Sequence, residues 1–249
     1  MGNIEPKIDL LKNYFEKNTI ICLNEVQNNI FQNILEKLSP EFYSYSLDKR
    51  IPGKNEGRNR KLGVCIIGNS FKIIENGIAD RTLFPERTNY AFLENINKKI
   101  KIFSFHSITG CDYKKAKSSN FASIADFIEL NNFDFITFDA NEPKVDVLDE
   151  NKLEFYDNKD KGKNAGLILG ANRVHTLNDS LRAWHLQNNI FNENDPLSIS
   201  FKTKTESKRY DYIYYEPSLW KIINIKYDYD NAVKAESDHA IIISEYEEK

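Results

Sequence analysis

The stretch FDFITFDAN, residues 133–141, shows the pattern that decides how this chain folds. Its first six residues are mostly apolar or aromatic, which predicts a β-strand, and the polar triplet that begins at Asp139 ends that strand. An apolar strand followed by a polar side chain also occurs at two earlier places: Glu25 lies near the end of TIICLNEV (19–26), and His106 ends KIFSFH (101–106). Polar residues thus recur where apolar strands end, and they are the first candidates for a functional site.

The rest of the chain alternates short strands with a few amphipathic helices. Apolar residues at helical spacing predict a helix over residues 28–38. A second helix is expected to begin at an N-cap on Ser118 or Ser119 and to end near Leu130. Further elements are expected as a helix over 178–187 and strands over 41–46, 62–67, 197–203, 210–215, 221–226 and 240–243.

This mixture of hairpin-like strand pairs and helices favours an α+β fold. The expected architecture is a four-layer α/β/β/α sandwich of two mainly antiparallel sheets with the helices outside. The sequence shows no internal repeat, linker or abrupt change in composition, so residues 1–249 are expected to form a single domain.

The composition limits the classes of function. Lys and Arg number 34 and Asp and Glu 37, which gives a formal net charge of −3. A protein that coats DNA carries a strongly basic surface, so this balance argues against that class while leaving room for a local basic face. Hydrophobic residues make up 41% of the chain, enough for a packed core and against intrinsic disorder.

The location of the protein is expected to be cytoplasmic, without a membrane partner. The first residues have neither a basic segment nor an apolar segment of a signal peptide, and no apolar run approaches the length of about 20 residues that a membrane span needs. A protein exported by a dedicated machine would have the same features. Cys22, Cys65 and Cys111 form no even set and are expected to be free thiols.

The remaining candidate residues are weak when they are taken one at a time. Asp139 and Asn141 form an Asp-x-Asn pair, which is ordinary for a turn after a strand. Asp238 and His239 directly precede the last expected strand. Asp211 is different, because a carboxylate between tyrosines in an apolar strand is costly unless it is paired. The alternative for Asp211 is a strand position that faces solvent.

Taken in chain order, these residues resemble the endonuclease/exonuclease/phosphatase superfamily. The motifs of that family read roughly LQE, a strand that ends in His or Tyr, GDxN, RxDY and SDH. The corresponding runs here are CLNEV (22–26), FSFHS (103–107), FDAN (138–141), RYDY (209–212) and ESDHA (236–240), with KLGVCII (61–67) and HTLNDSLRAW (175–184) as supporting runs. The resemblance covers about residues 20–244 and implies a deoxyribonuclease-like, metal-dependent phosphoesterase.

Three departures from the family pattern stand out. Phe138 replaces the Gly that usually precedes the Asp, and Ile241 replaces a Pro that often follows the SDH motif. The family also opens with a strand that ends in an Asn well before the Glu. Asn3 is the first Asn here, but no apolar strand precedes it. Either Asn3 takes that part, or the first strand is absent.

The resemblance implies a metal site in which the carboxylates of Glu25 and Asp238 are the ligands. Mg²⁺ is expected, with Mn²⁺ as an alternative, because Mg²⁺ is bound through a few carboxylates together with waters and substrate phosphates. Zinc is not expected, since the cysteines are scattered along the chain.

The resemblance also implies catalytic roles. His239 acts as general base on a water, or as electrostatic support to it, with Asp211 holding its ring. An imidazole near its ordinary pKa of about 6.5 suits that role. Asp139 orients or activates the same water, and the division of labour between Asp139 and His239 stays open. Asn141 donates to the scissile phosphate, and His106 stabilises the transition state or protonates the leaving group.

Basic residues in several loops are candidates for contacts with the substrate, and solvated surface is the alternative for all of them. The substrate-binding candidates are Asn3, Arg58, Arg60, Lys114, Lys115 and Arg209. If these loops converge, they bind a phosphate backbone without reading bases. Lys117 is expected in one such loop together with Lys114 and Lys115, and Lys202, Lys204 and Lys208 lead into the RYDY strand.

Three functions are compatible with these residues. The first is a metal-dependent nuclease that hydrolyses the phosphodiester bonds of DNA, because His106 followed by Ser107 is more similar to pancreatic-type deoxyribonucleases than to abasic-site endonucleases. The second is a phosphatase or phosphodiesterase that acts on a lipid or a small phosphoester. The third is a non-catalytic module that keeps the fold. Oligomeric state is not predicted by the sequence.

Overall fold

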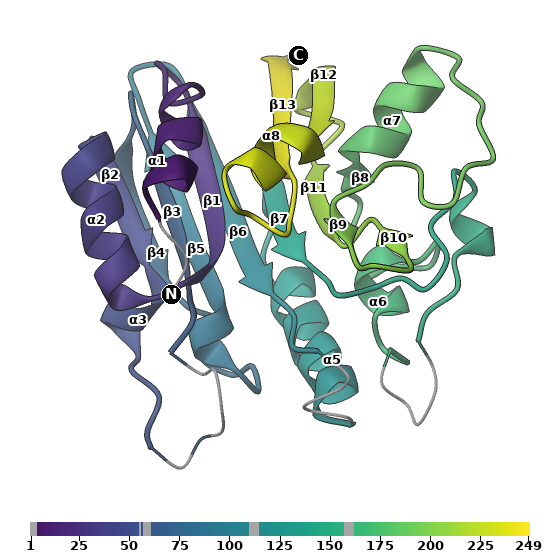
Figure 1. The fold of residues 1–249 in the computed structure, drawn as a ribbon, viewed down its shortest axis with the longest axis horizontal. Helices are drawn as coiled ribbons and strands as arrows, with labels where there is room; N and C mark the ends of the chain where they lie inside the picture. The colour runs from purple at the N-terminus through teal and green to yellow at the C-terminus, as the bar shows by residue number, and fades with distance from the viewer. Residues whose placement is uncertain (1–3, 55, 57–60, 110–114, 157–161) are drawn as a thin grey trace. The chain divides into compact units, whose positions relative to one another are not determined.

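The computed structural model describes residues 4–54, 56, 61–109, 115–156 and 162–249. The chain divides into two compact units, residues 1–106 and residues 107–249. Helices and antiparallel strands are mixed in both units, and the predicted α+β class is confirmed (Figure 1). Among the described residues, no helix is long and apolar enough to cross a membrane.

The strands of the first unit pair antiparallel and belong to two sheets. One has the strand order β1-β3-β2, and β4, β5 and β6 follow one another in the other. The elements are α1 (Glu5–Lys12), β1 (Ile20–Val26), α2 (Asn28–Leu38), β2 (Phe42–Tyr45), α3 (Ser46–Lys49), β3 (Gly63–Gly68), β4 (Lys72–Gly77), the 3-10 helix η1 (Pro85–Arg87), β5 (Thr88–Glu94) and β6 (Lys99–His106).

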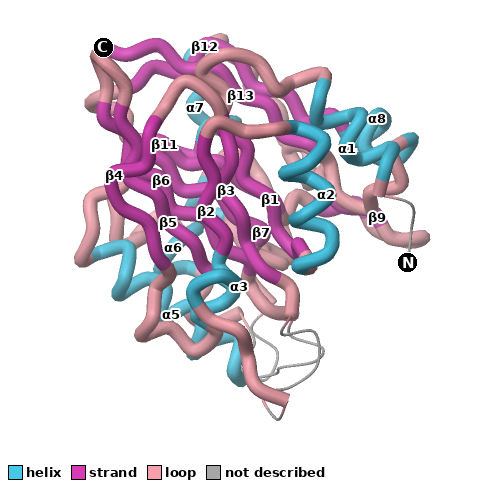
Figure 2. Tube along the Cα trace, turned by 90° about the vertical axis from the view of Figure 1, so that its left-hand side faces the viewer, coloured by secondary structure: helices cyan, strands magenta, loops and turns pink. Residues whose placement is uncertain are grey.

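The core of the first unit forms where these sheets and α2 meet. Phe31 of α2 stacks on Tyr45 of β2 with 4.0 Å between ring centroids. Figures 1 and 2 show α2 alongside the β1-β3-β2 sheet. Burying a side chain of this size contributes about 1.5–3 kcal/mol. The buried Asn89 of β5 connects the two sheets, since its amide donates to the carbonyls of Ser44 and Val64.

The second unit also pairs its strands antiparallel. β11 lies between β7 and β8, while β12 pairs with β13 and β9 with β10. The elements are α5 (Lys115–Glu129), β7 (Phe135–Asp139), the 3-10 helix η2 (Glu150–Lys152), α6 (Gly166–Leu169), β8 (Asn178–Asp179), α7 (Ser180–Gln187), β9 (Phe201–Lys202), β10 (Ser207–Lys208), β11 (Asp211–Tyr215), β12 (Trp220–Asp228), α8 (Tyr229–Lys234) and β13 (Ile241–Glu248).

Aromatic side chains pack the sheets of the second unit together. Phe135 of β7 lies between Trp220 of β12 and Tyr246 of β13, at centroid distances of 5.2 and 4.9 Å. Tyr215 of β11 contacts the same Tyr246 at 5.2 Å. These aromatic contacts join β7 and β11 to the β12–β13 pair.

The structure confirms some expected elements and corrects others. The helix over 28–38 is α2, with the bounds that its apolar spacing predicts. The N-cap prediction for the next helix is wrong, because α5 already includes Lys115 and contains both Ser118 and Ser119. The helix expected from residue 178 begins at Ser180, because β8 pairs with β11 and Asp179 caps α7 instead.

A buried cluster of four charges fixes the start of β11. The guanidinium of Arg209 is fully buried; its Nε lies 2.7 Å from Asp146 and its Nη2 lies 2.7 Å from Asp179. Arg182 of α7 pairs with the same two carboxylates. Burial raises the pKa of Asp179, but the charges of Arg209 and Arg182 outweigh it and hold that pKa well below its usual range.

We expect Arg209→Met to lower the free energy of unfolding by about 3–5 kcal/mol, because it leaves two buried carboxylates with one cation. Urea unfolding followed by circular dichroism at pH 7 measures the loss. The exposed Lys221→Met on β12 is the control and should change stability little. A loss below about 1 kcal/mol for Arg209→Met would contradict this account.

In the wild type, the contribution of Asp179 to the free energy of unfolding is present above its unfolded pKa of about 3.9. This contribution is lost as the pH falls below that value.

Candidate active site

The pairing of β7 with β11 brings two of the predicted acids together. In the antiparallel register, Asp139 at the end of β7 lies directly opposite Asp211 at the start of β11. Like charges at opposite positions of a strand pair are destabilising unless a cation or a hydrogen-bond donor compensates them. The sequence folds this way because an apolar run ends at Asp139 and another begins after Asp211, so the ends of the two strands coincide.

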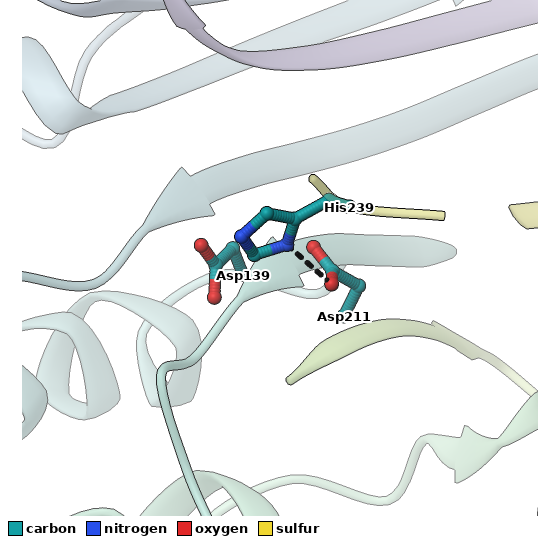
Figure 3. Close-up of side chains that lie close together, drawn as sticks. All are labelled: Asp139, Asp211 and His239. Atoms are coloured by element: carbon teal, nitrogen blue, oxygen red, sulfur yellow. Dashed lines mark hydrogen bonds and ion pairs between the residues drawn. The ribbon is translucent and has the colours of Figure 1, made fainter. Parts of the chain in front are cut away.

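His239 supplies the compensating group. Its Nδ1 lies 2.8 Å from Oδ2 of Asp211, and Figure 3 shows the imidazole between the two carboxylates. One ligand atom from each of the three side chains lies within 4.8 Å of the others. The side chain of Asp211 is 16% exposed and that of His239 is 28% exposed, so this cluster is reachable from solvent.

Backbone contacts hold the His239 ring in place. His239 forms an antiparallel bridge with Phe201 at the start of β9, and the amide of Ala240 donates to the carbonyl of Ser200 at 2.7 Å. The ring of Phe201 lies 4.9 Å from the imidazole. The hydroxyl of Ser237 donates to the carbonyl of His239 at 2.8 Å, which tightens the turn before β13.

The charges around His239 change its protonation. Burial lowers its pKa, but the carboxylate of Asp211, followed by Asp139 and Asp238, raises the pKa to about 10. This corrects the expectation of an ordinary value. With these three carboxylates nearby, His239 is therefore an imidazolium at neutral pH. His175 shows the opposite case: burial and the charge of Arg173 lower its pKa to about 4.

Asn141 lies in the turn after β7, next to the cluster. Its backbone is left-handed, with φ 49°, a conformation that Asn tolerates better than most residues. Its amide N–H donates to Oδ1 of Asp139 at 2.9 Å, and its side-chain Nδ2 donates to the carbonyl of Ser107 at 3.0 Å. The Asp-x-Asn pair is therefore the turn that the sequence suggests, and it also brings Asn141 beside Asp139.

Glu25 and His106 come together in the first unit. Nε2 of His106 lies 3.5 Å from Oε1 of Glu25, and its Nδ1 contacts the guanidinium of Arg87. His106 is 3% exposed, whereas the side chain of Glu25 is 58% exposed. Glu25 also has a left-handed backbone, with φ 58°, which interrupts the register between β1 and β3.

The other predicted residues have different positions. Asp238 is exposed and directly precedes His239. Lys115 is exposed at the start of α5. Asn3, Arg58, Arg60 and Lys114 lie outside the described residues. The expectation that Arg209 contacts the substrate is not supported, because its guanidinium is fully buried against Asp146 and Asp179.

Several of the predicted side chains can each offer a ligand to a metal ion. Asp139, Asp211 and His239 present one donor atom each, and Nδ1 of His239 is hydrogen-bonded to Oδ2 of Asp211. Glu25 and Asp238 each present an exposed carboxylate. Oxygen ligands and room for water fit Mg²⁺ better than zinc.

A separate cavity of about 1090 Å³ lies beside α7 in the second unit. Asp179 and Arg182 line it, together with Phe191 and residues around η2. Asp139, Asp211 and His239 do not line it. We place the chemistry at the Asp-His cluster, because cavity size alone supplies no reactive group.

The sequence did not indicate Phe201 as a residue of the site, and Lys117 was predicted to lie in a loop. Lys117 is instead buried in α5 with its Nζ on Glu142 and on the carbonyl of Asn141. A lysine on the same helical face as Phe121 and Ile124 was the available signal. Phe201 gave no such signal, because its contact with His239 depends on pairing between distant segments.

Comparison with known proteins identifies the fold. No family model matches the sequence, and no curated protein matches it. TDP2 from D. rerio, in a complex with a single-strand DNA product, has 12% sequence identity and a TM-score of 0.66 over 99% of this chain and 94% of its own. An endonuclease/exonuclease/phosphatase protein from Bacteroides vulgatus has 12% identity and a TM-score of 0.61 over 99% and 92%. ANGEL2, a 2′,3′-cyclic phosphatase with bound adenosine-2′,3′-vanadate, has 14% identity and a TM-score of 0.60 over 97% and 85%. The chain thus has the endonuclease/exonuclease/phosphatase fold, as its motifs predict.

We expect the His239 imidazole of the metal-free protein to stay protonated until the pH approaches 10. Asp211→Asn should lower that pKa by about 1–3 pH units, because it removes the nearest carboxylate charge. Titration of the histidine ring protons by nuclear magnetic resonance measures this, with His239→Gln as the assignment control. A raised pKa means that the pair stabilises the fold fully below about pH 6.5 and loses this effect as the pH rises through 10. A midpoint near 6.5 in both proteins would contradict the prediction.

Proposed function

We propose that this chain is a metal-dependent nuclease that hydrolyses phosphodiester bonds of DNA. The observation that carries the proposal is the hydrogen bond between Asp211 and His239 at the point where Asp139 faces Asp211 across β7 and β11. A carboxylate, an oriented imidazole and a second carboxylate are the groups that activate a water and stabilise a phosphoryl transition state.

The residues divide the work according to their protonation. Asp211 holds the His239 ring by its Nδ1, which leaves Nε2 to face the reacting groups. With a pKa of about 10, His239 carries a positive charge at neutral pH and suits electrostatic support of the phosphate. Asp139 then is the base that takes the proton of the water. The amide of Asn141 donates to the scissile phosphate, and His106 supports the leaving group.

We propose Mg²⁺ as the metal, with Glu25 and Asp238 as its carboxylate ligands. When bound, the ion supplies Lewis-acid stabilisation of the phosphoryl and leaving oxygens.

A nucleic acid fits the surroundings of His239 better than a small phosphoester does. The β9–β10 hairpin next to it exposes Lys202 and Lys204. Phe201 stacks on Tyr210 at 5.6 Å, so aromatic and basic side chains alternate beside the cluster. Basic residues that bind phosphates together with aromatic rings are typical of surfaces that bind unpaired strands. The fold neighbour TDP2 is itself described in a complex with single-strand DNA.

A phosphatase or phosphodiesterase for small phosphoesters is the second candidate. The observation in its favour is the fold neighbour ANGEL2, which is described as a 2′,3′-cyclic phosphatase. The same aspartates and histidine serve either reaction. Hydrolysis of a 2′,3′-cyclic nucleotide or an inositol phosphate, without cleavage of DNA, would select this function. A folded protein that neither binds Mg²⁺ nor hydrolyses any of these substrates would be a non-catalytic module.

We expect the protein to cleave plasmid DNA and single-stranded oligonucleotides in Mg²⁺ and to lose this activity in EDTA. His239→Ala should lower the rate by about 10²–10⁴-fold, because it removes the charge and the hydrogen-bonding group nearest the reacting atoms. Gel electrophoresis of the products measures both effects. The control is His185→Gln on α7, away from the Asp-His cluster, which should cleave at the wild-type rate once it is shown to fold. Cleavage that persists in EDTA, or an active His239→Ala variant, would disprove the mechanism.

A second prediction concerns the hairpin lysines. We expect Lys202→Ala with Lys204→Ala to weaken DNA binding and to reduce the slope of log K against log salt by about 0.7 per lysine that contacts a single strand. Fluorescence anisotropy with a labelled oligonucleotide in Ca²⁺ or EDTA measures this between 50 and 200 mM salt. Lys221→Ala, an exposed lysine on β12, is the matched control. An unchanged salt slope would remove the hairpin from the DNA-binding surface.

A further inference from the structure

A buried ion pair lies directly beside the turn that carries Asn141. Nζ of Lys117 donates to Oε1 of Glu142 at 2.6 Å and to the carbonyl oxygen of Asn141 at 2.7 Å. The side chain of Lys117 is 3% exposed and that of Glu142 is 0% exposed. The charge of Lys117 is therefore used within the fold, and its ammonium does not face a substrate.

Glu142 is held as firmly as the lysine that it binds. Its second oxygen, Oε2, accepts the backbone amide of Tyr156 at 2.9 Å. Gly162 approaches it so closely that a Cβ at that position would lie 2.6 Å from Oε1 of Glu142. Glu142 thus cannot move away easily, and it fixes where the ammonium of Lys117 can be.

Together with the bond from Lys117, each of three polar groups of Asn141 has its own hydrogen-bond partner. Its N–H binds Asp139, its side-chain amide binds Ser107, and its carbonyl binds Lys117. The left-handed backbone at Asn141, with φ 49°, is maintained by these bonds although it is uncommon for a residue with a Cβ. Among these partners, only Lys117 comes from a helix, so α5 anchors the turn to the body of the second unit.

A purely stabilising role does not require charges here. Replacing a buried ion pair with apolar residues of similar size is often neutral or stabilising. An apolar side chain at position 117, however, could not donate to the carbonyl of Asn141. The bond from Lys117 to Asn141 is therefore the part of the ion pair that an apolar substitute would lose.

We propose that Lys117 is a positioning residue, which holds Asn141 through its backbone carbonyl so that the Asn141 side chain is aligned for the scissile phosphate. This inference rests on the proposed function, in which Asn141 contacts the substrate. Lys117 itself touches no reacting atom. Because the phosphate contact strengthens in the transition state, the effect of losing Lys117 falls on kcat more than on KM.

The test compares two variants that differ in stability. Lys117→Met alone leaves the Glu142 carboxylate buried without its cation and should lower the melting temperature. Lys117→Met with Glu142→Gln removes both charges, and the Gln side chain can still accept the amide of Tyr156, so stability should recover. We expect kcat to stay reduced on the order of 10–100-fold in this double variant, with KM changed by less than about threefold. Lys115→Met, at an exposed position of the same helix, is the control and should leave the melting temperature unchanged.

A readout that does not depend on activity accompanies the kinetics. The backbone and side-chain amide signals of Asn141 in ¹⁵N-labelled protein should shift, and their hydrogen exchange should become faster, in the double variant. Lys117→Arg, which keeps a donor, should retain more of the wild-type spectrum and rate than Lys117→Met.

The outcomes separate this proposal from the proposed function. Recovery of kcat together with stability, or unchanged Asn141 signals in the double variant, would overturn the positioning role while leaving the nuclease proposal intact. A wild-type protein that cleaves no phosphoester would overturn the proposed function, and the amide signals of Asn141 would then decide alone whether Lys117 fixes this turn.

Discussion

The site depends on one constraint of the second unit, the register that places Asp139 opposite Asp211. Two carboxylates at facing positions repel each other, so the pair is stable only with a compensating group between them. His239 is that group, and its hydrogen bond to Asp211 joins the turn before β13 to the start of β11. The same negative charges that make the arrangement costly attract the imidazolium and so raise the pKa of His239.

That register depends in turn on the buried charges next to it. Arg209 lies two residues before Asp211, and its guanidinium is bound on both sides by Asp146 and Asp179. β11 therefore begins beside a fixed side chain, and Asp211 is its first residue. Asp179 also caps α7, so a single carboxylate orders a helix and a strand at once.

Apolar periodicity predicted the parts of the fold that depend on local sequence. α2 and the strand that ends at Asp139 follow from it directly. β4 was missed because exposed and charged positions interrupt its pattern, and β5 because its first two buried residues, Thr88 and Asn89, are polar. The start of α5 was misplaced because Lys117 was taken for a loop residue, although its spacing puts it on the apolar helical face, where it contacts Glu142.

The candidate site shows the same division. Asp139, Asp211 and His239 could be named from their motifs, and the structure brings them together. The place of Arg209 among basic loop residues also suggested a substrate contact, but pairing with distant acids buries its guanidinium. The pKa of His239 could not be read from the sequence at all, because it depends on acids that are close only in space.

The charged clusters of the second unit differ in burial and in charge balance. Arg182 and Arg209 form a neutral set with Asp146 and Asp179, as Lys117 does with Glu142, and both sets are buried. At the Asp-His cluster, two carboxylates share one imidazolium, and that cluster remains partly exposed. Because an uncompensated charge is costly to bury, the unbalanced cluster must stay in contact with water, unlike the two neutral sets.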